Sequence, residues 1–263
     1  MLMTAAGVVE ADLDLTISTL AERPDLEPSL WSLTGEWPAF MLQDPIADLY
    51  FADFERVFPE FALVAYDERQ PERLVARAFS VPFAFGPDVR RERLPDDGWD
   101  GIVRWAWLDR VRERKTTHVS ALDITVASEY RGFGLSSRML AALRDNAQRL
   151  GYAELVAPVR PSGKQRGPET SMSEYARETR DDGMPTDPWL RTHVRAGGEI
   201  EAVCPRSMVI AGTLAEWRGW TGLPFDRTED VVVPGALVPV RATVEHDTAV
   251  YVEPNVWVRH RLA

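Results

Sequence analysis

Residues 130–140 read Tyr-Arg-Gly-Phe-Gly-Leu-Ser-Ser-Arg-Met-Leu, and they join a strand pattern to a helix pattern through two glycines. Upstream, apolar residues alternate over 119–126, as in a half-buried strand. Downstream, apolar residues recur at helical spacing as far as Leu150, and a glycine follows as a stop. Gly132 and Gly134 let the backbone turn tightly and bring N–H groups toward a ligand at the positive end of a helix dipole. The junction therefore predicts a phosphate or pyrophosphate site.

The spacing of this glycine loop separates it from two better-known phosphate motifs. It lacks the third glycine of the dinucleotide fingerprint and the Gly-Lys-Ser/Thr end of the P-loop. Arg131-x-x-Gly134-x-Ser136 instead resembles the acyl-CoA loop of the GNAT superfamily of N-acyltransferases, which reads Arg or Gln, two residues, Gly, one residue, then Gly or Ala. Ser136 departs from that pattern, but serine is small enough to admit the phosphates. The alternative is an ordinary strand-to-helix turn, and the strand–loop–helix setting favours the acyl-CoA loop.

The order of the expected elements resembles the same family over most of the chain. We expect a first strand at 14–20, a short helix at 29–33, a helix from Asp44 to about Phe58, and an antiparallel hairpin over 61–85. The later elements are an inserted helix at 99–112, the strand at 119–126, the helix ending near 150, a strand at 153–159, a short helix at 189–196, and strands at 199–212, 231–244 and 248–259. The resemblance implies an α/β (α+β) fold with a GNAT-like mixed, mostly antiparallel central sheet, a splayed parallel strand pair and flanking helices.

The chain shows no linker and no internal repeat, so residues 1–263 are expected to form a single GNAT-like domain. Three parts exceed the family core. They are an inserted helical segment near 88–115, a long polar loop near 161–187 and a C-terminal extension from about 214. A loop of that length inside a compact domain is usually functional or mobile.

Composition restricts the classes of function. The net charge of −11 and the pI near 4.9 disfavour nucleic acid as a partner, and an acidic field favours a cationic amine. No apolar run approaches the roughly 20 residues of a membrane span, and the first twenty residues carry acidic side chains where a signal peptide is basic. We therefore expect a cytoplasmic protein that does not enter a membrane. Cys204 is the single cysteine, which excludes an intramolecular disulfide, and the four histidines lack metal-ligand spacing, so no metal is expected.

The resemblance also implies how acyl-CoA would bind. The strands at 119–126 and 153–159 would be parallel and splay apart to admit the pantetheine arm, and the N–H groups of the glycine loop would hold the pyrophosphate. A backbone N–H of Val126 would polarise the acyl carbonyl. For Arg131, a phosphate contact and a solvated loop position both stay open. The residues implied for co-substrate binding are Ile124, Thr125, Val126, Arg131, Gly132, Phe133, Gly134, Leu135, Ser136 and Ser137.

Direct acyl transfer needs a base for the ammonium proton and an acid for the leaving thiolate. In the family the acid is often the Tyr of a Tyr-x-x-x-Gly-Phe pattern, and the matching stretch here begins at His193 and ends in two glycines. His193 is therefore a candidate acid, and Tyr175 in the long loop is the other. Asp123 and His118 are the nearest candidate bases. Strict alternation predicts that Asp123 points away from the face of Ile124.

The resemblance implies an enzyme that moves an acetyl or other acyl group from acyl-CoA to the amine of a small or medium-sized acceptor by direct transfer. Acetyl-CoA is the default co-substrate, and a homodimer is left open. One alternative is a GNAT-like module that binds acyl-CoA without transferring it, which the missing tyrosine favours slightly. The other alternative is a GNAT-like enzyme with changed chemistry, such as decarboxylation or transfer to a thiol carrier.

Overall fold

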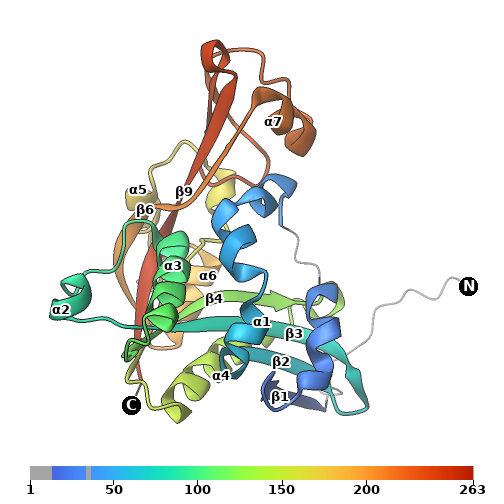
Figure 1. Cartoon of the computed structure of the whole chain (residues 1–263). Helices are drawn as coiled ribbons and strands as arrows, with labels where there is room; N and C mark the ends of the chain where they lie inside the picture. The colour runs from blue at the N-terminus through green and yellow to red at the C-terminus, as the bar shows by residue number, and fades with distance from the viewer. Residues whose placement is uncertain (1–13, 34–36, 263) are drawn as a thin grey trace, which may run out of the picture.

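The computed structural model describes residues 14–33 and 37–262, and this part of the chain builds a nine-stranded sheet with helices against it (Figure 1). The strands are β1 Leu15–Thr19, β2 Ala62–Asp67, β3 Gln70–Phe83, β4 His118–Val126, β5 Glu154–Val159, β6 Glu199–Gly212, β7 Asp230–Val231, β8 Val240–Thr243 and β9 Thr248–Arg261. The α-helices are α1 Phe54–Val57, α2 Pro87–Arg90, α3 Gly98–Val111, α4 Leu135–Arg149, α5 Met172–Tyr175, α6 Pro188–Arg195 and α7 Leu214–Thr221. Short 3-10 helices cover Pro24–Ser32, Ala39–Gln43, Pro59–Phe61, Ser128–Tyr130, Lys164–Arg166 and Val244–His246, and a π-helix covers Ala47–Phe51.

The sheet runs in the order β1-β2-β3-β4-β5-β9-β8-β7, and β6 pairs with the other edge of β9. Neighbouring strands are antiparallel except for β4 and β5, which are parallel. This arrangement confirms the predicted mixed, mostly antiparallel sheet. In the described part of the chain no helix is long and apolar enough to cross a membrane.

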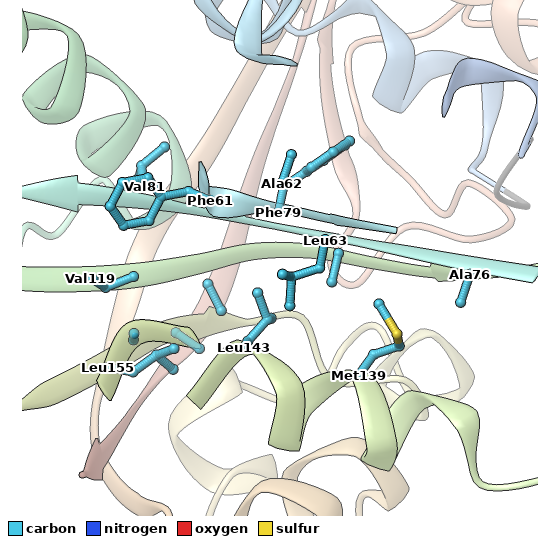
Figure 2. Close-up of a cluster of buried hydrophobic side chains, with 14 of the residues drawn as sticks. Phe61, Ala62, Leu63, Ala76, Phe79, Val81, Val119, Met139, Leu143 and Leu155 are labelled. Carbon is cyan, nitrogen blue, oxygen red and sulfur yellow. The ribbon is translucent and has the colours of Figure 1, made fainter. Parts of the chain in front are cut away.

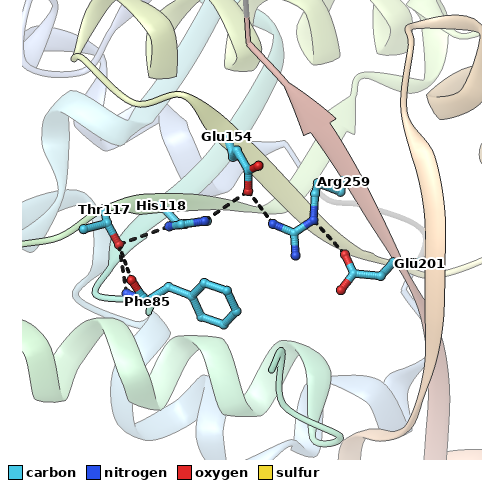
Figure 3. A network of polar contacts seen from close by, with 6 residues as sticks. All are labelled: Phe85, Thr117, His118, Glu154, Glu201 and Arg259. Atoms are coloured by element: carbon cyan, nitrogen blue, oxygen red, sulfur yellow. Dashed lines mark hydrogen bonds and ion pairs between the residues drawn. The ribbon is translucent and has the colours of Figure 1, made fainter. Parts of the chain in front are cut away.

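The parallel pair is joined only at its beginning. Val119 pairs with Leu155 and Ser120 with Val156, and the two strands then separate. A network of polar contacts joins β4, β5, β9 and β6 at the end where the two parallel strands are paired (Figure 3). His118 Nε2 lies 3.1 Å from Glu154 Oε2, Arg259 of β9 donates to the same carboxylate, and Arg259 Nε also donates to Glu201 at 2.8 Å. The predicted splay is therefore present, with its open end toward Ala121.

The main hydrophobic core lies on both faces of the sheet. Met139 and Leu143 of α4 point toward the strands from one side (Figure 2), and both are fully buried. Figure 1 shows α1 and α3 on the opposite side. There Phe54 packs against Phe79 of β3 with ring centroids 4.8 Å apart. Apolar side chains therefore pack on both faces of the sheet.

Two expected elements are interrupted. The helix predicted from Asp44 to Phe58 is broken into the π-helix and α1, although the Asp44 carboxylate accepts the N–H groups of Ile46 and Ala47 at 3.3 Å as expected for a helix start. The strand predicted over 231–244 is two short strands, β7 and β8. Prolines lie between them, and proline cannot donate to a strand ladder.

The chain after Leu214 includes a strand of the central sheet. Its last strand, β9, lies in the sheet between β5 and β6, so the added material is the stretch that connects β6 to β9. This stretch surrounds a second hydrophobic cluster that includes Phe40, Trp217 and Tyr251. Figure 1 shows α7 beside the far ends of β6 and β9.

Candidate functional site

A cavity of about 660 Å³ opens where β4 and β5 separate. Residues 121–124 of β4 and 157–159 of β5 line it, together with Glu253 and Asn255 of β9 and His193 of α6. Four tryptophans contribute aromatic surface to the cavity, namely Trp31, Trp37, Trp99 and Trp189. An apolar pocket with a few polar groups at the open end of a split sheet is typical of a small-molecule site.

The glycine loop forms the strand-to-helix junction that the sequence predicts. Gly132 and Gly134 have φ values of 85° and 77°, in the left-handed region that glycine adopts most readily. The hydrogen bonds that open α4 run from the N–H groups of Ser137 and Arg138 to Gly134 O, at 3.0 and 3.2 Å. The N–H groups of residues 132–136 lie before this first turn and donate no hydrogen bond within the described part of the chain, so they are available to an anion at the positive end of the helix. The contacts of this loop with a pyrophosphate stay a prediction.

The edge of β4 that faces β5 leaves space for an extended ligand. On its other edge, residues Ile124, Thr125 and Val126 pair with β3. On the β5 side, the described sheet gives β4 no strand partner beyond Ser120. Backbone groups at an unpaired edge bind extended chains, so the predicted position of the pantetheine arm fits this geometry. The guanidinium of Arg131 donates from Nε to Val126 O at 3.3 Å, which ties the loop to the end of the strand.

A β-bulge in β4 directly precedes Asp123. Phe79 of β3 pairs with Asp123, but Ser80 pairs with Ala121, so Leu122 is the extra residue. The indole of Trp99 donates to the Leu122 carbonyl at 3.2 Å. After the bulge the pairing is regular, so the Asp123 side chain lies with Thr125 and Arg77 on the face opposite to that of Ile124, and both Asp123 and Ile124 line the cavity.

Asp123 is held against a buried arginine. Its carboxylate lies 3.5 Å from Arg77 Nε and accepts the Thr125 hydroxyl at 2.9 Å. Arg77 also donates to Leu30 O at 2.6 Å. Burial raises the pKa of Asp123, while Arg77 and Thr125 oppose that increase, and burial lowers the pKa of Arg77. A carboxylate with a raised pKa in a cavity is suited to accept a proton.

His193 lines the cavity from α6 and is only 2 % exposed. Its Nδ1 lies 3.0 Å from Nε2 of the fully buried His260 on β9, and Trp189 packs edge-on against its ring at 4.8 Å. Burial, with a smaller effect of His260, lowers the pKa of His193 to about 3. His193 is therefore neutral at physiological pH, and its Nε2 is the ring nitrogen left for the cavity.

Two other candidates lie elsewhere. The Tyr175 hydroxyl donates to Asp187 at 3.0 Å, and Tyr175 does not line the cavity. Burial and the Asp187 carboxylate raise its pKa, which makes it a poorer acid. His118 lies at the closed end of the strand pair and is bound to Glu154. The geometry favours His193 and Asp123 over both.

A second charge pair of the cavity, between Arg160 and Glu253, could not be predicted from the sequence. Arg160 Nε lies 2.9 and 3.1 Å from the two oxygens of Glu253, which also accepts the Tyr251 hydroxyl at 2.8 Å and the Asn255 amide at 3.1 Å. These residues are 93 positions apart along the chain, and no motif links them. Asp48 is a further carboxylate of the lining, and within the described residues it has no ion-pair partner.

No protein-family profile matches the chain. In structure, it is similar to the loading GNATL domain of CurA from Lyngbya majuscula, with a TM-score of 0.55, 15% identity and coverage of 94% of this chain and 98% of that one. It is also similar to the GphF GNAT-like decarboxylase in complex with isobutyryl-CoA, with a TM-score of 0.54, 17% identity and coverage of 95% and 99%. At these identities the two structures establish a GNAT-like fold.

Sequence similarity extends the match beyond the fold. The chain is 32% identical over 275 aligned positions to the arginine N-acetyltransferase avaD of Aspergillus versicolor, and the alignment covers 93% of each protein. The chain therefore belongs to the GNAT superfamily of N-acyltransferases.

Proposed function

We propose that this protein transfers the acetyl group of acetyl-CoA to an amine of arginine or of a similar small guanidino compound. The observation that carries the proposal is the combination of the split β4–β5 pair, the glycine loop at the end of β4 and the cavity at the open end of the split. In this arrangement the pyrophosphate lies on the loop, the pantetheine arm follows the free edge of β4, and the thioester reaches the cavity beside the bulge at Leu122.

The arginine acceptor is taken from the avaD relative and is supported by the lining of the cavity. The guanidinium group is planar and cationic, and it binds both to carboxylates and to the faces of aromatic rings. Asp48 offers a carboxylate that no cation of the described residues neutralises, and four tryptophans offer ring faces. The overall charge of −11 also attracts a cation.

The chemistry follows from the residues at the split. Asp123 accepts a proton from the acceptor ammonium, and the neutral nitrogen then attacks the thioester carbon. A C–N bond forms, the C–S bond breaks with its electron pair staying on sulfur, and the attacking nitrogen releases its second proton to solvent. The CoA thiolate takes up a proton from solvent, so that the products are the N-acetyl compound and CoA.

The test is an assay of thiol release from acetyl-CoA with arginine, lysine, ornithine and citrulline as acceptors. Citrulline is the matched control, because it keeps the shape of arginine and replaces the cation with a neutral urea. We expect thiol release with arginine, formation of a product heavier by one acetyl group, and a much lower kcat/KM with citrulline.

Other outcomes identify the alternatives. Tight calorimetric binding of acetyl-CoA without thiol release from any acceptor would support the non-catalytic module. Conversion of malonyl-CoA to acetyl-CoA without an acceptor would support decarboxylation. Equal rates with arginine and citrulline would support N-acetyl transfer but would show that the enzyme does not recognise the guanidinium group.

A further inference from the structure

The imidazoles of His193 and His260 form a buried pair that the reaction described above does not use. Their rings come from α6 and β9, and Nδ1 of His193 lies 3.0 Å from Nε2 of His260. Burial lowers the pKa of the two rings to about 3 and about 4, and no carboxylate among the described residues forms an ion pair with either. Each ring is therefore neutral at physiological pH and carries one proton.

One proton lies between the two rings. The nitrogen atom that carries this proton determines whether Nε2 of His193 is a hydrogen-bond donor or acceptor toward the cavity. If His260 Nε2 carries it, His193 Nδ1 accepts, and His193 Nε2 bears an N–H. If His193 Nδ1 carries it, His193 Nε2 presents a lone pair, and the proton of His260 must lie on Nδ1. The first arrangement makes His193 a hydrogen-bond donor toward the ligand, and the second makes it an acceptor.

The surroundings of His260 Nδ1 favour the first arrangement. This atom is buried and has no hydrogen-bond partner in the described part of the chain. A buried N–H without a partner is rarer and costlier than a buried acceptor without one. Arg144 of α4 lowers the pKa of His260 through its positive charge, and a cation favours a lone pair over an N–H directed toward it. The Ala196 backbone acts in the opposite direction on that pKa, but it does not supply Nδ1 with a hydrogen bond.

Gly198 makes the contact between the two rings sterically feasible. A Cβ at this position would lie 2.7 Å from His260 Cε1 and 2.8 Å from His193 O. The N–H of Gly198 donates to that same carbonyl at 2.9 Å, which fixes the turn after α6. The absence of a side chain therefore lets His260 of β9 approach the end of the helix that carries His193.

We infer that His260 is a positioning residue that fixes His193 as a neutral Nε2–H donor facing the reacting thioester. This inference rests on the proposed function. A neutral imidazole is too weak an acid to protonate a thiolate, but its N–H stabilises negative charge that develops on the thioester oxygen or sulfur. His193 thus replaces a proton-donating acid with a fixed hydrogen bond, and the proton that neutralises the thiolate comes from water.

The first experiment reads the tautomers directly and needs no acceptor. The protein labelled with ¹⁵N-histidine is examined by NMR between about pH 5 and pH 8, and the signals are assigned with His193→Gln and His260→Gln. We expect both rings to stay neutral, with the proton of His193 on Nε2. A proton on Nδ1 of His193, or an imidazolium near neutral pH, would overturn the inference even if acetyl transfer is confirmed.

The second experiment separates a hydrogen-bond donor from a proton donor. Glutamine offers an amide N–H near the position of Nε2 but cannot transfer a proton, whereas leucine offers neither. We expect His193→Leu to lower kcat by about 10²–10³-fold, and His193→Gln to recover activity to within about tenfold of the wild type. Equal loss in both variants, with acetyl-CoA binding retained by calorimetry, would contradict the donor role.

The same comparison at His260 tests its positioning role. His260→Leu removes the N–H that His193 Nδ1 accepts, so we expect kcat to fall about 10-fold or more while KM for acetyl-CoA is unchanged. His260→Gln keeps a donor near that position and should recover most of the loss. An unchanged kcat in His260→Leu would remove His260 from the mechanism. If no acceptor reacts with the wild type, the proposed function fails, and the NMR experiment still decides the tautomer.

Discussion

At the scale of single residues, Gly198 shows how strongly the site depends on the absence of a side chain. Gly198→Ala would place a Cβ against both His260 and the His193 carbonyl, and the backbone oxygen cannot move away cheaply. We expect the free energy of unfolding to fall by about 1–3 kcal/mol and kcat to fall with it. Gly219→Ala is the matched control. Gly219 is exposed in α7 with no neighbour within 4 Å of a Cβ, and alanine there should stabilise by about 0.4–1 kcal/mol. Urea unfolding of both variants checks the sign of each change.

The glycine loop can be tested without confusing charge with backbone strain. Asn and Asp have almost the same shape and both tolerate positive φ, so Gly132→Asn and Gly132→Asp differ mainly in one negative charge. A Cβ at Gly132 meets no atom within 4 Å, so neither variant creates an internal clash. We expect Asp to weaken acetyl-CoA binding by about tenfold or more relative to Asn, because it repels the pyrophosphate. Calorimetric titration measures both affinities, and equal values would contradict the loop assignment.

At this scale, features with a local sequence signal could be predicted. The glycines at 132 and 134 lie where a strand gives way to a helix, and their conformation matches the expectation. The bulge at Leu122 could not be predicted, because a bulge depends on how β3 pairs with β4 and alternation assumes a regular strand. The contact between His193 and His260 could not be predicted either, because the two residues lie 67 positions apart and no spacing rule connects them.

At the scale of elements, the start of α3 carries a buried acid whose ionisation opposes folding. Burial and the neighbouring Asp44 carboxylate raise the pKa of Asp100 to about 9, from 3.8 in the unfolded chain. Between these two values the folded state holds a proton that the unfolded state has lost, so the contribution of this group to stability falls as the pH rises. Asp100→Asn keeps an acceptor for the Val209 N–H and removes the titration.

We therefore expect Asp100→Asn to gain stability relative to the wild type as the pH is raised from about 4 to about 9. Thermal unfolding at several pH values measures the difference in Tm. Asp88→Asn, at an exposed position of α2, is the control and should show no such trend. A constant difference across the pH range would mean that Asp100 is ionised in the folded protein.

Elements with a clear period or strong end signals were predicted well, and elements set by distant contacts were not. Strands β2 and β3 and helix α4 follow from alternation, helical spacing and flanking Pro or Gly. The helix expected to begin at Asp44 has the right start but is interrupted, and its residues line the cavity at Ala47, Asp48 and Phe51 and pack on the sheet at Phe54. The place of β9 between β5 and β6 depends on pairing across the whole second half of the chain.

At the scale of the whole molecule, the cavity lies where two hydrophobic clusters meet. Ala121, Ala157 and Val159 belong to the large cluster around the sheet, whereas Met41 belongs to the cluster built by the stretch between β6 and β9. None of residues 213–247 lines the cavity, and the stretch between β6 and β9 is connected to the lining through the 3-10 helix that carries Met41.

The net charge of −11 gives the donor and the acceptor opposite long-range interactions with the protein. A cationic acceptor is attracted and the anionic acetyl-CoA is repelled, and salt screens both effects as the Debye length falls from about 10 Å at 0.1 M to about 3 Å at 1 M. We expect kcat/KM for arginine to fall several-fold as NaCl is raised over this range, while kcat/KM for acetyl-CoA stays constant or rises. Because both values come from the same enzyme and the same assay, each is the control for the other. An equal fall in both would indicate a general effect of salt on the protein, and a rise for arginine would show that the acceptor does not bind as a cation.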